Sequence, residues 1–162
     1  MVQNKKSNTN KKIHTTIRRT KTYKKQTSNK HLQILPNTHT RHIVKIFIEM
    51  LNMVKLYHWK TRSYAQHKAT DDLYTKLNEH IDTFIEVLLG KTESRIKSME
   101  NNLTLLNINN VEDFKERVYE YREFLIDMNG YLDSKKDTDL LNIRDELLGD
   151  INQFLYLLTF DK

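Results

Sequence analysis

The stretch LYHWKTRSYAQHKATDDLY, residues 56–74, joins two runs of helical periodicity. Apolar side chains recur at three- and four-residue steps on either side of it, which predicts helices over about residues 40–62 and 64–89. The apolar positions are Ile43, Phe47, Met50, Leu51, Val54 and Leu56, then Leu73, Leu77, Ile81, Phe84 and Leu88. His58 lies on or beside the buried face of the first helix, where a polar ring needs a physical reason.

Two further amphipathic runs follow towards the C-terminus. They predict a third helix over about residues 111–132 and a fourth over about 139–159. Their apolar positions are Phe114, Val118, Tyr121, Leu125 and Met128, then Leu140, Ile143, Leu147, Leu148, Ile151, Phe154, Leu155 and Leu158. Asn110 and Thr138 are the expected N-caps. Four amphipathic helices of this length predict an all-α, antiparallel four-helix bundle over residues 38–162.

Few residues in the chain break helices. The 162 residues include three Gly and one Pro, too few for the many turns of a sheet protein. Gly90 follows the last apolar residue of the second helix, where a C-terminal glycine belongs. The connection after it is polar, with a short helix expected near residues 93–101. Gly149 lies inside the fourth helix, and the sequence offers no reason for it.

Residues 1–37 form a basic arm that is predicted to be disordered, because it holds too few large apolar residues to offset the entropy of ordering. Its ten cations are Lys5, Lys6, Lys11, Lys12, Arg18, Arg19, Lys21, Lys24, Lys25 and Lys30, and no acidic residue precedes Glu49. Such a segment indicates non-specific DNA binding that depends on salt. A solubilising or targeting tail is the alternative.

A polar edge beside the apolar stripe of the second helix carries candidate metal ligands. With His67 as zero, Asp71, Asp82 and Glu86 fall at about 40°, 60° and 100° on a helical wheel. Imidazoles with carboxylates suit Fe(II), Mn(II) or Zn(II). His67 and Asp82 are about 22 Å apart along one straight helix, so they cannot share an ion. Two copies packed antiparallel about a two-fold axis would bring the His end of one helix to the carboxylate end of the other.

Each of these features also has a simpler interpretation. A single His beside an apolar stripe is usually a structural, hydrogen-bonded His. A carboxylate pair at i,i+4, such as Asp82 and Glu86, usually belongs to a solvated face. The metal interpretation therefore depends on the combination and not on any one residue.

The same residues resemble the Dps proteins, the mini-ferritins of the ferritin-like superfamily. The resemblance rests on His58-Trp59, on His67 with an acid four positions later, and on the D-x-x-x-E tail DTFIE, which runs from Asp82 to Glu86. It implies a ferritin-like four-helix subunit with a ferroxidase site at a two-fold interface, often in a twelve-subunit shell. Segments SYAQHKATDDLY and LLGK are also similar to a poorly characterised ferritin-like family of phages and large DNA viruses.

The resemblance also implies roles for single residues. Asp82 and Glu86 would hold the first iron, and His58, His67 and Asp71 would complete the site or hold a second ion. Trp59 would lie nearby as an electron donor. Core packing is the simpler interpretation of Trp59. The segment HWKTRSYAQH is three residues shorter than is usual in the family, with Lys60 in place of an Asn. Lys60 and Arg62 are interpreted as solvated cations, with steering of anions as the alternative.

The resulting hypothesis is a Dps-like, ferroxidase-type protein that oxidises Fe(II) with peroxide or oxygen and binds DNA through its arm. It would be a cytoplasmic homo-oligomer, located in host cytoplasm, nucleoid or virion if the source is viral. No apolar run approaches the roughly 20 residues of a membrane span. The alternatives are a non-catalytic nucleic-acid-binding or virion packaging protein on the same scaffold, and a purely structural helical oligomer.

Overall fold

The structure is a computed structural model that describes residues 37–96, 103, 105 and 107–160. Its helices are α1 (Asn37–Lys60), α2 (Tyr64–Lys91), α3 (Val111–Asp127) and α4 (Thr138–Leu157), with the 3-10 turns η1 (Met128–Gly130) and η2 (Leu158–Phe160). The described residues contain no strand, so the all-α prediction is confirmed. The basic arm lies outside the described residues, except that Asn37 already belongs to α1.

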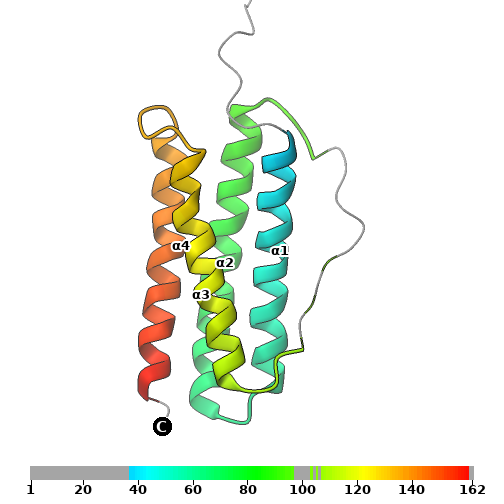
Figure 1. The fold of residues 1–162 in the computed structure, drawn as a ribbon, viewed down its shortest axis with the longest axis vertical. Coiled ribbons are helices and arrows are strands. Elements are labelled where there is room, and N and C mark those ends of the chain that lie inside the picture. The colour runs from blue at the N-terminus through cyan, green and yellow to red at the C-terminus, as the bar shows by residue number, and fades with distance from the viewer. Residues whose placement is uncertain (1–36, 97–102, 104, 106, 161–162) are drawn as a thin grey trace, which may run out of the picture.

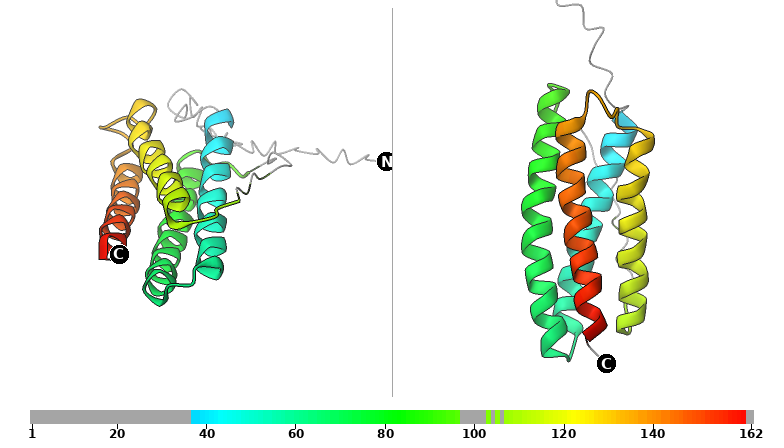
Figure 2. Two further views of the ribbon diagram at one scale, coloured as in Figure 1. Left: turned by 60° about the horizontal axis from the view of Figure 1, so that its bottom comes forward. Right: turned by 90° about the vertical axis from the view of Figure 1, so that its left-hand side faces the viewer.

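The four long helices lie side by side, and their axes are roughly aligned with the long axis of the molecule (Figures 1 and 2). A tight turn joins α1 to α2 at one end of the molecule, and a second turn joins α3 to α4 at the opposite end (Figure 1). α2 ends and α3 begins at opposite ends of the molecule (Figure 1), so α3 runs in the same direction as α2. α2 packs against both α1 and α4, and α3 packs mainly against α4.

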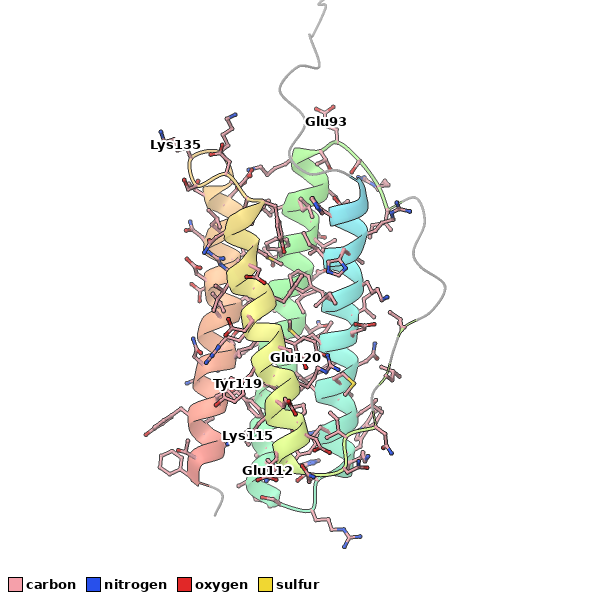
Figure 3. The ribbon with its side chains drawn as sticks, viewed as in Figure 1. Glu93, Glu112, Lys115, Tyr119, Glu120 and Lys135 are labelled. Atoms are coloured by element: carbon pink, nitrogen blue, oxygen red, sulfur yellow. The ribbon has the colours of Figure 1, made fainter. Side chains whose placement is uncertain are left out.

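The apolar faces of the four helices form one core. Each long helix contributes a phenylalanine with at most 2% of its surface exposed, namely Phe47, Phe84, Phe114 and Phe154. The rings of Phe47 and Phe84 meet edge to face with centroids 5.3 Å apart, and those of Phe114 and Phe154 do so at 5.8 Å. The outward face of α3 carries charged side chains and Tyr119, as Figure 3 shows.

Several predicted helix ends need correction. α1 ends at Lys60, two residues before the expected end. Gly90 lies inside α2 without a positive φ, and Glu93 instead adopts the left-handed conformation, with φ of 46°. Thr138 is the first residue of α4, and the N-cap position belongs to Asp137, whose side chain makes no capping hydrogen bond.

Other predictions about the connections have mixed outcomes. Asn110 caps α3 as expected, because its side chain accepts a hydrogen bond from the main-chain N–H of Asp113 at 2.8 Å. The α-helical part of the third helix ends at Asp127 and continues as η1. The short helix near residues 93–101 does not form over residues 93–96, and its remainder lies outside the described residues. No helix of the described ranges is long and apolar enough to cross a membrane.

Candidate metal site at the α1–α2 turn

The turn between α1 and α2 consists of residues 61–63 and is closed by side-chain hydrogen bonds. Ser63 caps α2, since its hydroxyl accepts from the main-chain N–H of Gln66 at 3.3 Å. The side-chain oxygen of Gln66 accepts from the hydroxyls of Tyr57 and Thr61, each at 2.6 Å. These bonds fix the end of α1 against the start of α2.

His58 and His67 meet across this turn and form a reciprocal pair. Their rings stack with centroids 3.8 Å apart and planes inclined by 24°. Nδ1 of His58 lies 3.0 Å from the carbonyl oxygen of His67, and Nδ1 of His67 lies 3.0 Å from the carbonyl oxygen of His58. A carbonyl oxygen can only accept, so both Nδ1 atoms carry the hydrogen. In the neutral rings, both Nε2 atoms therefore keep a lone pair that can bind a metal ion.

The surroundings of His58 explain a histidine on the buried face of α1. His58 is only 7% exposed, and the fully buried Thr70 packs beside it. The Thr70 hydroxyl donates to the main-chain oxygens of Gln66 and His67, and it lies 3.3 Å from Nδ1 of His58, from which it can accept. The Nδ1 atom of His58 is therefore hydrogen-bonded as in a structural histidine. Its Nε2 atom makes no hydrogen bond to a described residue.

The predicted carboxylates do not join this pair within one chain. Asp71 keeps 49% of its side chain exposed and lies 3.9 Å from Lys68. Asp82 and Glu86 are exposed further along α2, and neither makes an ion pair with any described residue. Among the residues that the structure describes, no three His, Asp or Glu side chains lie close enough to hold one ion. The fold thus brings together His58 and His67 alone.

Trp59 does not pack in the core, so that interpretation is wrong. Its side chain is 68% exposed. The ammonium group of Lys55 lies 5.7 Å from the centroid of the Trp59 ring and 4.7 Å from that of Tyr74. Trp59 is thus part of a solvent-facing cluster of one cation and two aromatic rings on α1 and α2.

His80, which was not a candidate ligand in the sequence analysis, pairs with a carboxylate. His80 lies away from the polar edge of α2 and instead faces α4, where its Nδ1 is 2.8 Å from Oδ2 of Asp150. Both side chains are largely covered, so the pair links α2 to α4. Only the packing of α4 against this side of α2 identifies the partner, because 70 residues separate the two in sequence.

Comparison with known protein families gives a match over most of the bundle. A family model described as a family of unknown function, DUF5856, matches residues 58–158. No curated protein and no solved structure matches the chain. The matched region begins at His58, contains all five predicted ligands and covers more than half of the 162 residues. The chain therefore belongs to DUF5856, a family whose function is unknown.

Proposed function

We propose that this chain is a metal-binding, ferritin-like protein that oxidises Fe(II) at sites built by two copies of the chain. The observation that carries the proposal is the reciprocal pair of His58 and His67, which holds two imidazoles with both Nε2 lone pairs available. Neutral imidazole suits Fe(II), and Mn(II) or Zn(II) are alternative ions for the same donors. The shared direction of α2 and α3 agrees with a ferritin-like bundle, which has one long crossover between helices.

The missing ligands are available on a second copy. Asp82 and Glu86 are exposed and make no ion pair with a described residue, so binding an ion would break no pair within the described part of the chain. About 22 Å of helix separates Asp82 from His67, which an antiparallel copy of α2 would bridge. Each site would then take His58, His67 and Asp71 from one chain and the two carboxylates from its partner, in a two-fold dimer or a larger shell.

The charges along α1 and α2 favour this antiparallel pairing. Residues 50–70, near the α1–α2 turn, include four Lys or Arg and no acidic residue. Residues 77–90, at the other end of α2, include Glu79, Asp82 and Glu86 and no Lys or Arg. Two antiparallel copies would bring residues 50–70 of each against residues 77–90 of the other, and the opposite charges of these two stretches would favour association in this direction.

The chemistry assigned to the site is one-electron oxidation of each Fe(II) substrate. Two Fe(II) ions supply two electrons, which with two protons reduce one hydrogen peroxide to two waters. The carboxylates would balance the positive charge of the ions, while His58 and His67 supply neutral donors whose Nδ1–H groups stay on main-chain oxygens. Oxygen is the alternative oxidant.

The decisive experiment follows Fe(II) oxidation by absorbance, first with peroxide and then with oxygen. We expect fast oxidation at a fixed ratio of iron to chain, lost in Glu86→Ala and retained in Glu79→Ala, which removes a neighbouring exposed carboxylate outside the ligand set. A wild-type rate equal to that of the buffer would refute the proposal.

A mixing experiment tests whether two chains build the site. His67→Ala and Glu86→Ala would each be inactive, but a mixed dimer would contain one intact site. Random re-assortment should therefore restore roughly a quarter of the wild-type sites. Mixtures that stay inactive, from variants that still form dimers, would show that the ligands do not come from two chains.

Nucleic-acid binding is the second candidate, and the ten cations of the arm, residues 1–37, which contain no acidic residue, favour it. Deleting residues 1–36 should abolish a DNA mobility shift whose strength falls steeply with salt. DNA binding without metal uptake would favour the non-catalytic packaging role. The loss of both activities would favour a purely structural oligomer.

A further inference from the structure

A cavity opens at the end of the bundle that contains the α1–α2 turn. Its volume is about 500 Å³, within the range of small-molecule sites. Its walls combine three segments: the end of α1 with the turn, the first residues of α2, and residues 108–111, which lead into α3. None of the predicted metal ligands lines it, so it is distinct from the proposed iron site.

Two cations line this cavity and no carboxylate does. The ammonium group of Lys60 donates to the side chain of Asn107 at 3.0 Å and also to the carbonyl oxygen of Ile108. An ammonium group has three N–H donors, so one N–H of Lys60 remains to bind a ligand. Arg62 is exposed and pairs with no carboxylate among the described residues. The two positive charges therefore favour an anion in the cavity.

Two helix N-termini add to the preference of the cavity for an anion. Ser63 and Asn110, which cap α2 and α3, both line the cavity, so the positive ends of two helix dipoles lie at its surface. The hydroxyls of Tyr57 and Thr61 are held on Gln66, which keeps this side of the cavity in place before a ligand arrives. A guanidinium group with unused donors matches a phosphate group in a two-point hydrogen-bonding geometry.

We propose that this cavity binds a phosphate group, with Arg62 as its main donor and Lys60 as the second cation. A phosphate ester of a small molecule and a phosphodiester of a nucleic-acid strand share this chemistry. None of the described residues that line the site belongs to the basic arm, residues 1–37.

The test is calorimetric titration of the full chain, in the presence of a chelator, with three probes: inorganic phosphate, ATP and a single-stranded oligonucleotide without terminal phosphates. The variant is Arg62→Gln. The matched control is Arg95→Gln, which removes an exposed arginine two residues from Glu93, at the other end of the bundle (Figure 3). We expect Arg62→Gln to weaken binding roughly tenfold and Arg95→Gln to leave it unchanged.

The three probes separate the two sources of phosphate. Weaker binding of ATP and phosphate alone would assign the cavity to a small phosphorylated ligand, and weaker binding of the oligonucleotide would assign it to a strand. Both variants keep the basic arm, so any binding by the arm is the same in both and does not affect the comparison between them. The proposal is overturned if the two variants bind all three probes equally, or if the wild-type chain binds none. Unchanged thermal unfolding would confirm that Arg62→Gln is folded.

Discussion

His58 and His67 hold each other's main chain: the ring of each donates its Nδ1–H to the carbonyl oxygen of the other, at 3.0 Å in both directions. The carbonyl of His58 lies in the last turn of α1, where main-chain oxygens have no partner within the helix. His67 supplies that partner from α2. The pair therefore closes the α1–α2 turn as well as presenting two free Nε2 atoms, and these two roles can be separated.

His58→Asn should separate structure from metal binding. The side-chain amide of Asn places an N–H group close to the position of Nδ1, so it can keep the bond to the carbonyl of His67, but it has no counterpart of Nε2. We expect His58→Ala to lower the free energy of unfolding by about 2–3 kcal/mol, and His58→Asn by about 1 kcal/mol or less. Urea denaturation measures both effects.

Metal binding should respond differently from stability. Both His58→Asn and His67→Asn should lose the visible absorption of bound Co(II), which reports nitrogen coordination. His80→Asn is the matched control, because His80 bonds to Asp150 outside the proposed site. If His58→Asn retained the Co(II) spectrum, Nε2 of His58 would not be a ligand.

Lys91 links the end of α2 to the start of α4 and to the turn before it through three oxygens. Its ammonium group lies 2.7 Å from Oδ1 of Asp139 and 3.1 Å from Oδ1 of the buried Asp137, and it donates to the carbonyl of Lys136 at 2.8 Å. We expect Lys91→Met to lower the free energy of unfolding by about 1.5–3 kcal/mol. Lys135→Met, on the same turn but without an ion pair among the described residues, should have little effect (Figure 3).

The ion-pair part of the stabilisation by Lys91 should be lost in acid. Burial alone would raise the pKa of Asp139, but the hydrogen bonds from Lys91 and from the main-chain N–H of Leu140 outweigh it and hold the pKa below the ordinary 3.8. A lowered pKa stabilises the fold above 3.8, and this stabilisation is lost as the pH falls through the folded-state value. The difference in thermal unfolding between wild type and Lys91→Met should therefore narrow from pH 6 towards pH 3. A constant difference would contradict this assignment.

Arg144 is a buried guanidinium that joins α4 to the end of α3. It is 5% exposed and donates to the carbonyl of Leu125 at 2.8 Å and to the side chain of Asn129 at 3.0 Å. Arg144→Met should cost about 2–3 kcal/mol, because it leaves both acceptors without this partner. Arg144→Lys should restore little of this, since a single ammonium group lacks the fork that reaches both. Equal stability of Arg144→Lys and wild type would show that charge alone suffices.

The fold was largely predictable because burial sets the helical pattern. Phe47, Phe84 and Phe114 were all placed on apolar stripes, and each is completely buried. The helix ends were harder to predict, since several neighbouring residues can each supply the hydrogen bond that caps a helix. Arg144 was also unpredictable: a charged residue on a buried face makes sense only once the end of α3 is known to lie beside it.

The candidate site was predictable only in part. The periodicity placed His58 on the buried side of α1, which the structure confirms. The stacking of His58 on His67 depends on the exact closure of the turn by Gln66, which no spacing rule contains. The two-chain arrangement of the carboxylates stays a prediction.

The glycines of this fold are placed where their flexibility is not needed. Gly149 is exposed inside α4, and a Cβ there would meet no atom within 4 Å. Gly90 has equally open surroundings in the last turn of α2. Glu93, by contrast, has a φ of 46°, a conformation that an L side chain adopts at a cost.

Exchanging these residues should stabilise the protein. Gly149→Ala and Gly90→Ala should each add about 0.5–1 kcal/mol to the free energy of unfolding, because Ala loses less backbone entropy in a helix. Glu93→Gly should relieve about 1 kcal/mol of strain, partly offset by the greater freedom of glycine in the unfolded chain. Urea denaturation of the single variants and of the triple variant measures these changes. The effect of Gly149→Ala should add to the other two, because Gly149 lies on another helix, whereas Gly90→Ala and Glu93→Gly should deviate from additivity because the N–H of Glu93 donates to the carbonyl of Gly90 at 3.2 Å. Destabilisation by Gly149→Ala would mean that another chain covers this face of α4, and the dependence of unfolding on protein concentration would then reveal that contact.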